Sequence, residues 1–521
     1  MLHRVRRGRA GARSHLDADA APGVPTLAIS TVLVAYMLGL GFGGLTAGRL
    51  APRVRNGVRV YGWVELCIGF YALAAPALLG WIPKIGAEWL YGLDFGTASL
   101  VRFALALILL IFPTFCMGAT LPLLVRALVR EEAGGAGRRI GLLYGLNTFG
   151  AVAGVLLTSY VLFPLLGLRG TGYFGAGLEL MVGALALIFI APRVADSPTV
   201  APATRERRPL RPGRWLPLLA YGTVGFTALV YEISWSRALS MVLGSSIYAF
   251  SNMLAAFLLG IALGSVTLGP RLQRLRDPLL VYALGIALLG FLALLTIFLL
   301  PRLPSAFTFW VQTFGVQTGW LIAVQLVLSI AVMLPPAFVL GALFPLLAGV
   351  LAEDENASSA TGDVYFVNTV GSAAGAFAAG FFMIPSLGLR GTLGAAVALN
   401  LAFAAVLLFR SGKGQPGRRM LLAAVPALAA VVIAFHPPSL DPHTLAQGAF
   451  RLDELSNRGV KPSEFLIDVP GEELVYYRDG INTSVSVHQS AGVYSLHVNG
   501  KIDGSSSGDM PTQTLLGEVG V

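Results

Sequence analysis

The sequence predicts a mainly α-helical, polytopic membrane protein with about twelve transmembrane helices, followed by a small β-rich segment. Three observations predict this fold class. The 521-residue chain is 55% hydrophobic and only 12% charged, whereas soluble domains are typically about 25% charged. Its apolar runs repeatedly reach the roughly 20 residues that a helix needs to cross a bilayer. Residues 473–521 instead alternate polar and β-type side chains.

Residues 1–25 are expected to form a polar N-terminal tail. The segment is first basic, then acidic, and never apolar, so it does not read as a secretory signal. One hypothesis is that a first transmembrane helix equivalent to residues 215–236 has been lost from the start of the sequence. The alternative is a natural disordered tail.

Residues 26–193 and 215–436 are predicted to be two membrane repeats, the second with an additional final helix. Residues 28–39 match 249–260 at an offset of 221, and 144–150 match 365–371 at the same offset. A third block, 167–171, matches 388–392. Three separated blocks at one offset indicate an internal duplication. The predicted spans are 26–48, 60–79, 100–124, 140–163, 170–190, 215–236, 248–268, 279–300, 320–350, 364–384, 392–409 and 420–435.

Arginine-rich segments between the helices predict the orientation. The chain has a formal net charge of +10, and its arginines collect in short interhelical stretches such as 49–59 and the basic linker 194–214. Such clusters mark the cytoplasmic side of a bacterial inner-membrane protein. Because they recur on the same side of both halves, the repeats are expected to be parallel, a layout similar to that of major-facilitator transporters.

This orientation places the residues after 435 outside the cytoplasm. Either the long span 320–350, which contains Pro335 and Pro336, is misassigned, or the C-terminal segment faces the periplasm. Residues 437–472 are expected to be a juxtamembrane linker. The lipid bilayer is the predicted partner and nucleic acid is not, because no basic face accompanies a folded soluble domain. The oligomeric state is not predicted.

Polar residues inside the predicted spans are candidates for function, because ionisable groups in lipid are costly and usually face a cavity or a partner. Buried carboxylates would suit a cationic amine. The alternative is that Glu232 pairs with Arg237 and that the asparagines bond between helices. The candidates are Glu65, Glu179, Glu232, Arg237, Asn147, Asn368 and Asn400. No motif with metal-ligand spacing is present, so no metal site is predicted.

The C-terminal segment contains a predicted hairpin. Strand-like residues 483–488 and 494–498 precede an Asn499-Gly500 turn and a short return strand at 501–503. The patterns at 498–503 (VNGKID) and 508–513 (GDMPTQ) resemble the N-terminal region of the spermidine synthase, or polyamine aminopropyltransferase, family. The likeness extends to the bacterial branch that fuses a major-facilitator-like membrane region to such a domain.

This resemblance implies that residues 473–521 are the truncated start of an aminopropyltransferase domain. Its co-substrate would be decarboxylated S-adenosylmethionine and its acceptor a polyamine; no other cofactor is expected. The family's nucleotide loop and catalytic base would lie beyond Val521, so no catalytic residue is assigned and the chain as given is expected to be inactive.

The same resemblance places Asn482 near the nucleoside and Gln513 at the amine pocket. Thr512 stands where the family has a tyrosine that packs on the diamine, which argues against ordinary putrescine specificity. Asp509 is either part of this pocket or the N-cap of a helix that has Pro511 in its first turn. Two functions are therefore expected as alternatives: a membrane-embedded aminopropyltransferase-like enzyme, or a multi-pass transporter of amines or other small solutes with a vestigial or sensory C-terminal domain.

Overall fold

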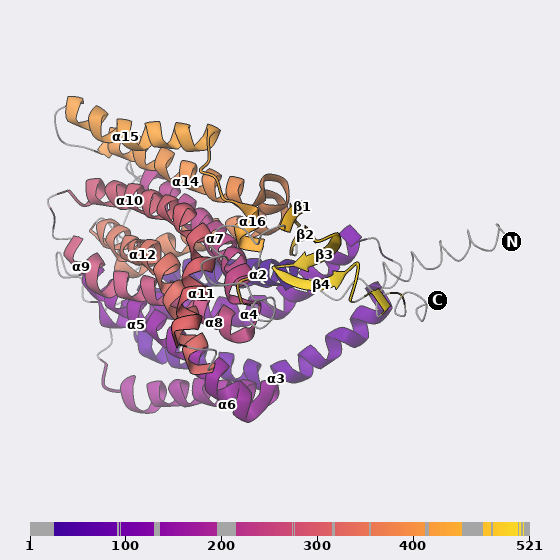
Figure 1. The fold of residues 1–521 in the computed structure, drawn as a ribbon. Helices are drawn as coiled ribbons and strands as arrows, with labels where there is room; N and C mark the ends of the chain where they lie inside the picture. The colour runs from indigo at the N-terminus through magenta and orange to yellow at the C-terminus, as the bar shows by residue number, and fades with distance from the viewer. Residues whose placement is uncertain are drawn as a thin grey trace.

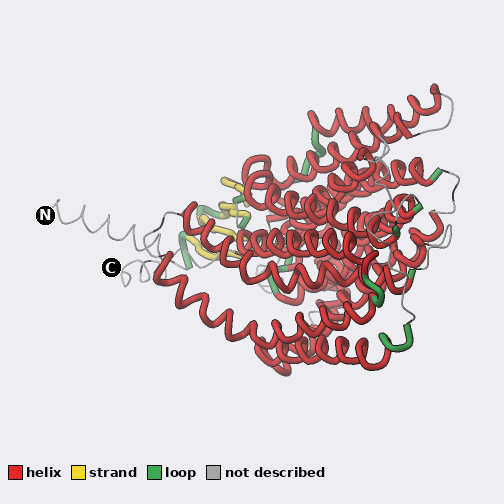
Figure 2. The backbone as a smooth tube through the Cα atoms, turned by 180° about the vertical axis from the view of Figure 1, so that it is seen from behind, coloured by secondary structure: helices red, strands yellow, loops and turns green. Residues whose placement is uncertain are grey.

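Long helices pack side by side into a bundle, and a small sheet lies at one end of it (Figure 1). The computed structural model describes residues 25–90, 93, 95–129, 136–194, 215–272, 275, 277–314, 318–353, 356–411, 416–446, 448–450, 472–480, 483–508, 510–511 and 514. Seen from behind, the strands again lie at one end of the helices (Figure 2).

The helices follow the apolar runs of the sequence. Their bounds are α2 Pro25–Leu50, α3 Gly57–Leu90, α4 Phe95–Leu128, α5 Ala136–Leu157, α6 Phe163–Leu185, α7 Trp215–Leu243, α8 Ile247–Leu263, α9 Gly269–Leu272, α10 Pro278–Leu299, α11 Leu303–Phe314, α12 Thr318–Ala352, α13 Ala357–Ala378, α14 Ile384–Ser411, α15 Pro416–Phe435 and α16 Pro442–Ala446. Short 3₁₀ segments occupy Ala51–Arg53 and Leu300–Arg302.

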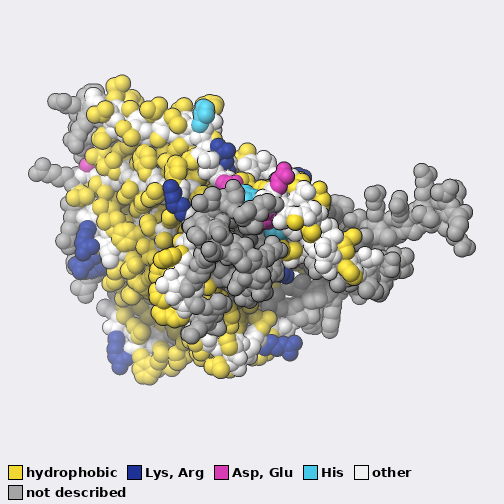
Figure 3. Space-filling model, in the orientation of Figure 1, with side chains coloured by type: hydrophobic (Ala, Val, Ile, Leu, Met, Phe, Trp, Pro, Cys, Tyr) yellow, Lys and Arg dark blue, Asp and Glu magenta, His cyan; other side chains and the backbone are white. Residues whose placement is uncertain are grey.

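Within the described residues, nine helical segments are long and apolar enough to cross a membrane. Hydrophobic side chains cover much of the helical surface on the face seen in Figure 3. Because such a surface is favourable in lipid rather than in water, this is a multi-pass membrane protein.

Two of the nine segments, Ala136–Ile190 and Ala357–Arg410, are more than twice as long as one span requires. Each contains one glycine outside the helical region, Gly167 with φ of 64° and Gly388 with φ of 67°. A positive φ at these positions favours glycine, since a Cβ would be strained there. The helical path is therefore broken at the middle of each long segment.

The same local geometry occurs twice at a separation of 221 residues. A π-helical turn at Thr158–Leu162 precedes Gly167, and a second one at Ala379–Met383 precedes Gly388. Two other π-helical turns, Ala186–Ile190 and Gly264–Leu268, have no counterpart at this spacing among the described residues. The recurrence is therefore specific to the two turns that precede Gly167 and Gly388.

Most of the core lies around α7. Trp235 and Tyr231 of this helix are fully buried and stack with ring centroids 5.2 Å apart. Trp235 Nε1 donates a hydrogen bond to Thr296 Oγ1 of α10 at 2.9 Å. Buried Trp and Tyr need such partners for their polar atoms.

Glycines allow α13 to approach α7 closely. A Cβ added at Gly371 would clash with the carbonyl oxygen of Gly222, and one added at Gly375 would clash with that of Phe226. Small residues at four-residue spacing are typical of tight helix pairs in membranes. The residues 221 positions earlier, Gly150 and Gly154 of α5, would have nothing within 4 Å of an added Cβ.

The C-terminal sheet is an antiparallel meander in the order β1-β2-β3-β4. Its strands are β1 Glu472–Asp479, β2 Ser484–Ser490, β3 Val493–Val498 and β4 Lys501–Ser505. The predicted turn is present: Asn499 and Gly500 have φ of 50° and 79°, as tight hairpins require.

The sheet contacts α7 near its C-terminal end and α14 near its N-terminal end, opposite to the ends of these helices at which arginine-rich segments occur in the sequence. Arg237, near the end of α7, bonds the backbone next to β1, whereas α7 begins directly after the arginine-rich segment 205–214. Leu389, near the start of α14, bonds β1, whereas Arg410 lies in the last turn of α14. The span that contains Pro335 and Pro336 is one helix, α12.

Candidate functional site

The sheet has a polar buried face. Ser484, Ser486 and His488 of β2 are buried, while the intervening Val485 and Val487 are half-buried. A sheet that packs on an ordinary core shows the opposite pattern, with apolar residues inside. Because polar groups are buried only when something compensates them, this face of the sheet is a candidate site.

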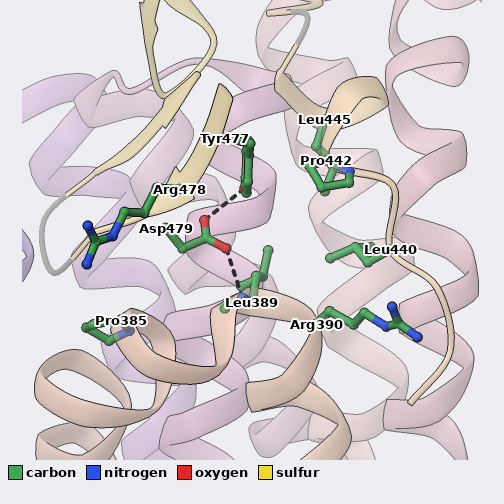
Figure 4. Close-up of a pocket in the computed structure, with 10 residues that line it drawn as sticks. Pro385, Leu389, Arg390, Leu440, Pro442, Leu445, Tyr477, Arg478 and Asp479 are labelled. Carbon is green, nitrogen blue, oxygen red and sulfur yellow. Dashed lines mark hydrogen bonds between the residues drawn. The ribbon is translucent and has the colours of Figure 1, made fainter. Parts of the chain in front are cut away.

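Asp479 anchors the sheet to the helix bundle. Its Oδ1 accepts hydrogen bonds from the hydroxyl groups of Tyr477 (2.8 Å) and Ser484 (2.5 Å). Its Oδ2 accepts from the backbone N–H of Leu389 at 3.0 Å, directly after the broken helix at Gly388 (Figure 4). These three donors engage both oxygens of the carboxylate. Asp479 therefore holds the sheet in position, and its oxygens are already used as hydrogen-bond acceptors.

Two further groups support this anchor. Arg237 Nη1 donates to the carbonyl oxygen of Gly480 at 2.7 Å. Burial, followed by the negative charge of Asp479, raises the pKa of Tyr477. Tyr477 therefore keeps its proton at neutral pH and remains a hydrogen-bond donor.

A cavity of about 380 Å³ lies beside Asp479, between the start of α14, α16 and β1 (Figure 4). Its lining residues are Pro385, Gly388, Leu389, Arg390, Leu440, Pro442, Leu445, Tyr477, Arg478 and Asp479. Arg390 Nε donates to the carbonyl oxygen of Pro437 at 3.1 Å. The charged groups that line this cavity are Arg390, Arg478 and Asp479, and the Arg390 guanidinium is engaged by the backbone at Pro437.

A second cluster lies on the same sheet. Glu472 of β1, His488 of β2 and His497 of β3 each offer one ligand atom, and these atoms all lie within 4.8 Å of one another. His488 Nδ1 is 3.0 Å from Glu472 Oε1, and the two imidazole rings stack with centroids 4.2 Å apart. Two histidines and a carboxylate are a donor set that can hold a metal ion.

The ionisation of Glu472 depends on this cluster. Burial by itself raises the pKa of Glu472, but the hydrogen bond from His488 and the positive charge available on the nearby histidines outweigh burial, so the net shift is downward. The carboxylate is therefore ionised at neutral pH.

No metal site was predicted from the sequence, because the three residues lie on separate strands and lack the spacing of a metal-binding motif. The signal that could have indicated the cluster is a Ser-X-His triplet, which occurs at 486–488 and again at 495–497, on either side of a turn. In the antiparallel register, His488 is opposite Ser495 and His497 is opposite Ser486. This pairing brings both histidines onto one face.

The intramembrane candidates do not converge on one path. Glu65 of α3 is 7% exposed and lies within hydrogen-bonding reach of Glu179 of α6 and of Tyr61. Glu232 and Arg237 are on α7, and Arg237 belongs to the sheet interface. The predicted pairing of Glu232 with Arg237 stays a prediction.

The asparagines occupy different environments. Asn400 is fully buried; its Oδ1 accepts from Thr227 at 2.9 Å and its Nδ2 donates to the Tyr231 hydroxyl at 3.1 Å. This is the interhelical bonding that was considered as the alternative to a substrate path. Asn368 is half-buried, and Asn147 is exposed on the surface of α5. The residues assigned by resemblance, Asn482, Asp509, Thr512 and Gln513, lie outside the described residues.

Fold and site together define a multi-pass membrane protein with a polar, histidine-containing sheet at one end of its helices. No protein-family model matches the chain. The chain is 27% identical over 241 residues to "Polyamine aminopropyltransferase 1" of Streptomyces coelicolor (strain ATCC BAA-471 / A3(2) / M145). The match covers 45% of this chain and 41% of that relative, so this chain spans less than half of the relative's length. This similarity supports a distant spermidine synthase-like relationship.

Proposed function

We propose that this chain is a membrane-embedded, spermidine synthase-like protein of the fused type, in which the C-terminal sheet is the N-terminal part of an aminopropyltransferase unit. The observation that carries the proposal is the similarity to a polyamine aminopropyltransferase. The antiparallel meander with its Asn499-Gly500 turn supports it, because the family resemblance implies a hairpin region at this place.

In the proposed reaction, an amine nitrogen attacks the propyl carbon next to the sulfonium of decarboxylated S-adenosylmethionine. The C–N bond forms as the C–S bond breaks, methylthioadenosine leaves, and the amine gives its proton to a base. The protein's part is to position the two reactants and to accept that proton. We assign no catalytic residue within residues 1–521.

The test is an assay of the protein expressed from its natural reading frame and reconstituted in lipid vesicles made permeable to substrates. Decarboxylated S-adenosylmethionine and putrescine or spermidine are added, and methylthioadenosine and the extended amine are measured by mass spectrometry. Release of methylthioadenosine only when amine is present supports the proposal. Absence of both products, with the protein folded, contradicts it.

The alternative function is transport of a small amine or another solute. The observation that favours it is the pair of carboxyl groups, Glu65 and Glu179, that face each other between membrane helices. Uptake of labelled putrescine into sealed vesicles is then expected, and it should be lost in Glu179→Gln. If uptake is unchanged in that variant, this carboxylate pair is not part of a transport path.

We further propose that the membrane region is a parallel internal duplication with twelve spans in a bacterial inner membrane. The π turns and the non-helical glycines that recur 221 residues apart support the duplication. If the chain reverses at Gly167 and Gly388, the nine long segments become eleven spans, and the shorter apolar helix Arg419–Phe435 is the twelfth.

A further inference from the structure

We propose that Glu472, His488 and His497 form a binding site for a divalent transition-metal ion, with zinc as the best-matched example. The site lies on the polar face of the sheet, outside the membrane helices. It is independent of the proposed aminopropyl transfer, because that displacement requires no metal.

The spacing of the donor atoms carries the first step. In a tetrahedral zinc site with bonds of about 2.0–2.1 Å, neighbouring ligand atoms lie roughly 3.3 Å apart. His488 Nδ1 and Glu472 Oε1 are 3.0 Å apart, which is close to that spacing. Because the three candidate ligand atoms lie within 4.8 Å of one another, no pair has to close by more than about 1.5 Å to reach this spacing.

The second step is the orientation of the two imidazole rings. His488 Nε2 lies 2.9 Å from Ser486 Oγ, and His497 Nε2 lies 2.9 Å from Ser495 Oγ. Without a metal ion, His488 Nδ1–H donates to Glu472. A bound metal ion would replace this proton, and each Nε2–H would then donate to its serine. Metal-binding histidines characteristically have their second nitrogen fixed by such a partner.

The third step is the burial and stacking of the two rings. His488 and His497 are 1% and 5% exposed, and their rings stack with centroids 4.2 Å apart at an interplanar angle of 21°. One ring therefore has to turn about its Cβ–Cγ bond before both Nδ1 atoms point at one ion. One metal ion uses the lone pairs of both neutral rings, and the Glu472 carboxylate offsets part of its charge. The Nδ1 atoms of both rings are buried.

The donor set decides the class of metal. Two imidazole nitrogens and one carboxylate suit zinc and related transition metals, whereas calcium and magnesium prefer all-oxygen sites. A fourth position remains for water or for a further ligand. His443 of α16 is the nearest additional imidazole, with its ring centroid 5.9 Å from that of His488. Metal binding by Glu472, His488 and His497 would therefore join β1, β2 and β3.

The experiment uses the full chain, purified with an affinity tag that contains no histidine and stripped of metal with a chelator. Titration with Zn²⁺ should show one site per chain and raise the thermal unfolding temperature of the sheet. Titration with Co²⁺ should produce the visible absorption of a low-coordinate nitrogen–oxygen site. Calcium at 1000-fold excess should not compete.

Four variants make the result specific to this site. His497→Gln, which keeps a polar side chain, should lower the zinc affinity at least tenfold. The double variant H488Q/H497Q should abolish zinc binding. Ser486→Ala should lower the affinity about tenfold while leaving the sheet folded. His436→Ala is the control, because His436 is exposed at the end of α15 and should not change binding.

The proposal is overturned if stripped protein binds no zinc. It is also overturned if zinc binds equally well to wild type and to H488Q/H497Q, since the metal then binds elsewhere. Hydrogen exchange of the β2 and β3 amides shows whether each variant retains its sheet, so a loss of binding is interpreted only for a folded protein.

Discussion

Asp479 accepts hydrogen bonds from donors on β1, β2 and α14, which makes one carboxylate responsible for joining the sheet to the helix bundle. A charged acceptor makes stronger hydrogen bonds than a neutral one. At the scale of single residues, the interface therefore depends on few contacts, and each of them can be tested separately.

Replacing Asp479 with asparagine should loosen the sheet from the bundle. The substitution removes the charge and puts an amide donor beside groups that already donate, which should cost about 1–3 kcal/mol. Hydrogen exchange at the Leu389 amide and along β1 should become faster. Asp503→Asn is the matched control: Asp503 is 41% exposed and paired with the exposed Lys501, so this substitution should have almost no effect. Equal exchange in the two variants would contradict the anchoring role.

Asn400 provides a second residue-scale prediction. Asn400→Ala removes an acceptor for Thr227 and a donor to Tyr231, and interhelical hydrogen bonds in membranes contribute on average about 0.6 kcal/mol, with a maximum near 1.7. Thermal unfolding in detergent should occur at lower temperature. Asn147→Ala, on an exposed position of α5, should unfold like wild type. A larger loss for Asn147 than for Asn400 would show that polarity at α5 is more important than buried bonding.

At the scale of helices, equivalent positions of the sequence repeat have different neighbours. Gly371 and Gly375 of α13 pack against the backbone of α7, whereas Gly150 and Gly154 of α5 have no atom near the position of a Cβ. Positions 221 residues apart therefore differ in what covers these helix faces within the described residues.

This difference predicts opposite outcomes for the same substitution. Gly371→Leu should push α13 away from α7 and destabilise the bundle by about 1–3 kcal/mol or more, because overpacking at a close helix contact cannot relax easily. Gly150→Leu should be nearly neutral. Folded yield and thermal unfolding in detergent measure both. If Gly150→Leu is as damaging as Gly371→Leu, the α5 face is covered by another helix in the membrane.

At the scale of the whole molecule, the sheet contacts α7 and α14 at the ends opposite to those at which arginine-rich segments occur in the sequence. If the arginines face the cytoplasm, the sheet faces the other side. Because the span that contains Pro335 and Pro336 is one helix, α12, this arrangement favours the topology in which the C-terminal segment faces the periplasm.

Cysteine labelling tests this orientation. In a background where Cys67 and Cys116 are replaced by alanine, Lys501→Cys should react with a membrane-impermeant maleimide in intact cells, because Lys501 is 67% exposed on β4. Arg53→Cys, at an exposed position between α2 and α3, should react only after permeabilisation. The reverse pattern would place the sheet in the cytoplasm.

The sequence predicted the features that depend on local pattern. Apolar runs of span length predicted the long helices, which the structure contains. The Asn499-Gly500 pair predicted a hairpin turn, and both residues have positive φ. These predictions succeed because hydrophobic length and turn chemistry act over a few neighbouring residues. The extra strand β1, which pairs with β2, was not predicted, because its residues do not alternate clearly.

The sequence by itself determined that this is a membrane protein with a β-rich C-terminal segment, because composition and periodicity fix how each stretch meets lipid or water. Only the tertiary structure decided which polar side chains meet. Glu472, His488 and His497 converge because of the strand register, and a slip of one residue would turn these side chains to the opposite face. Likewise, Asp479 reaches Leu389 only because the helix is broken at Gly388 and the sheet packs there. Register and packing depend on contacts between residues far apart in the chain, and no local pattern encodes them.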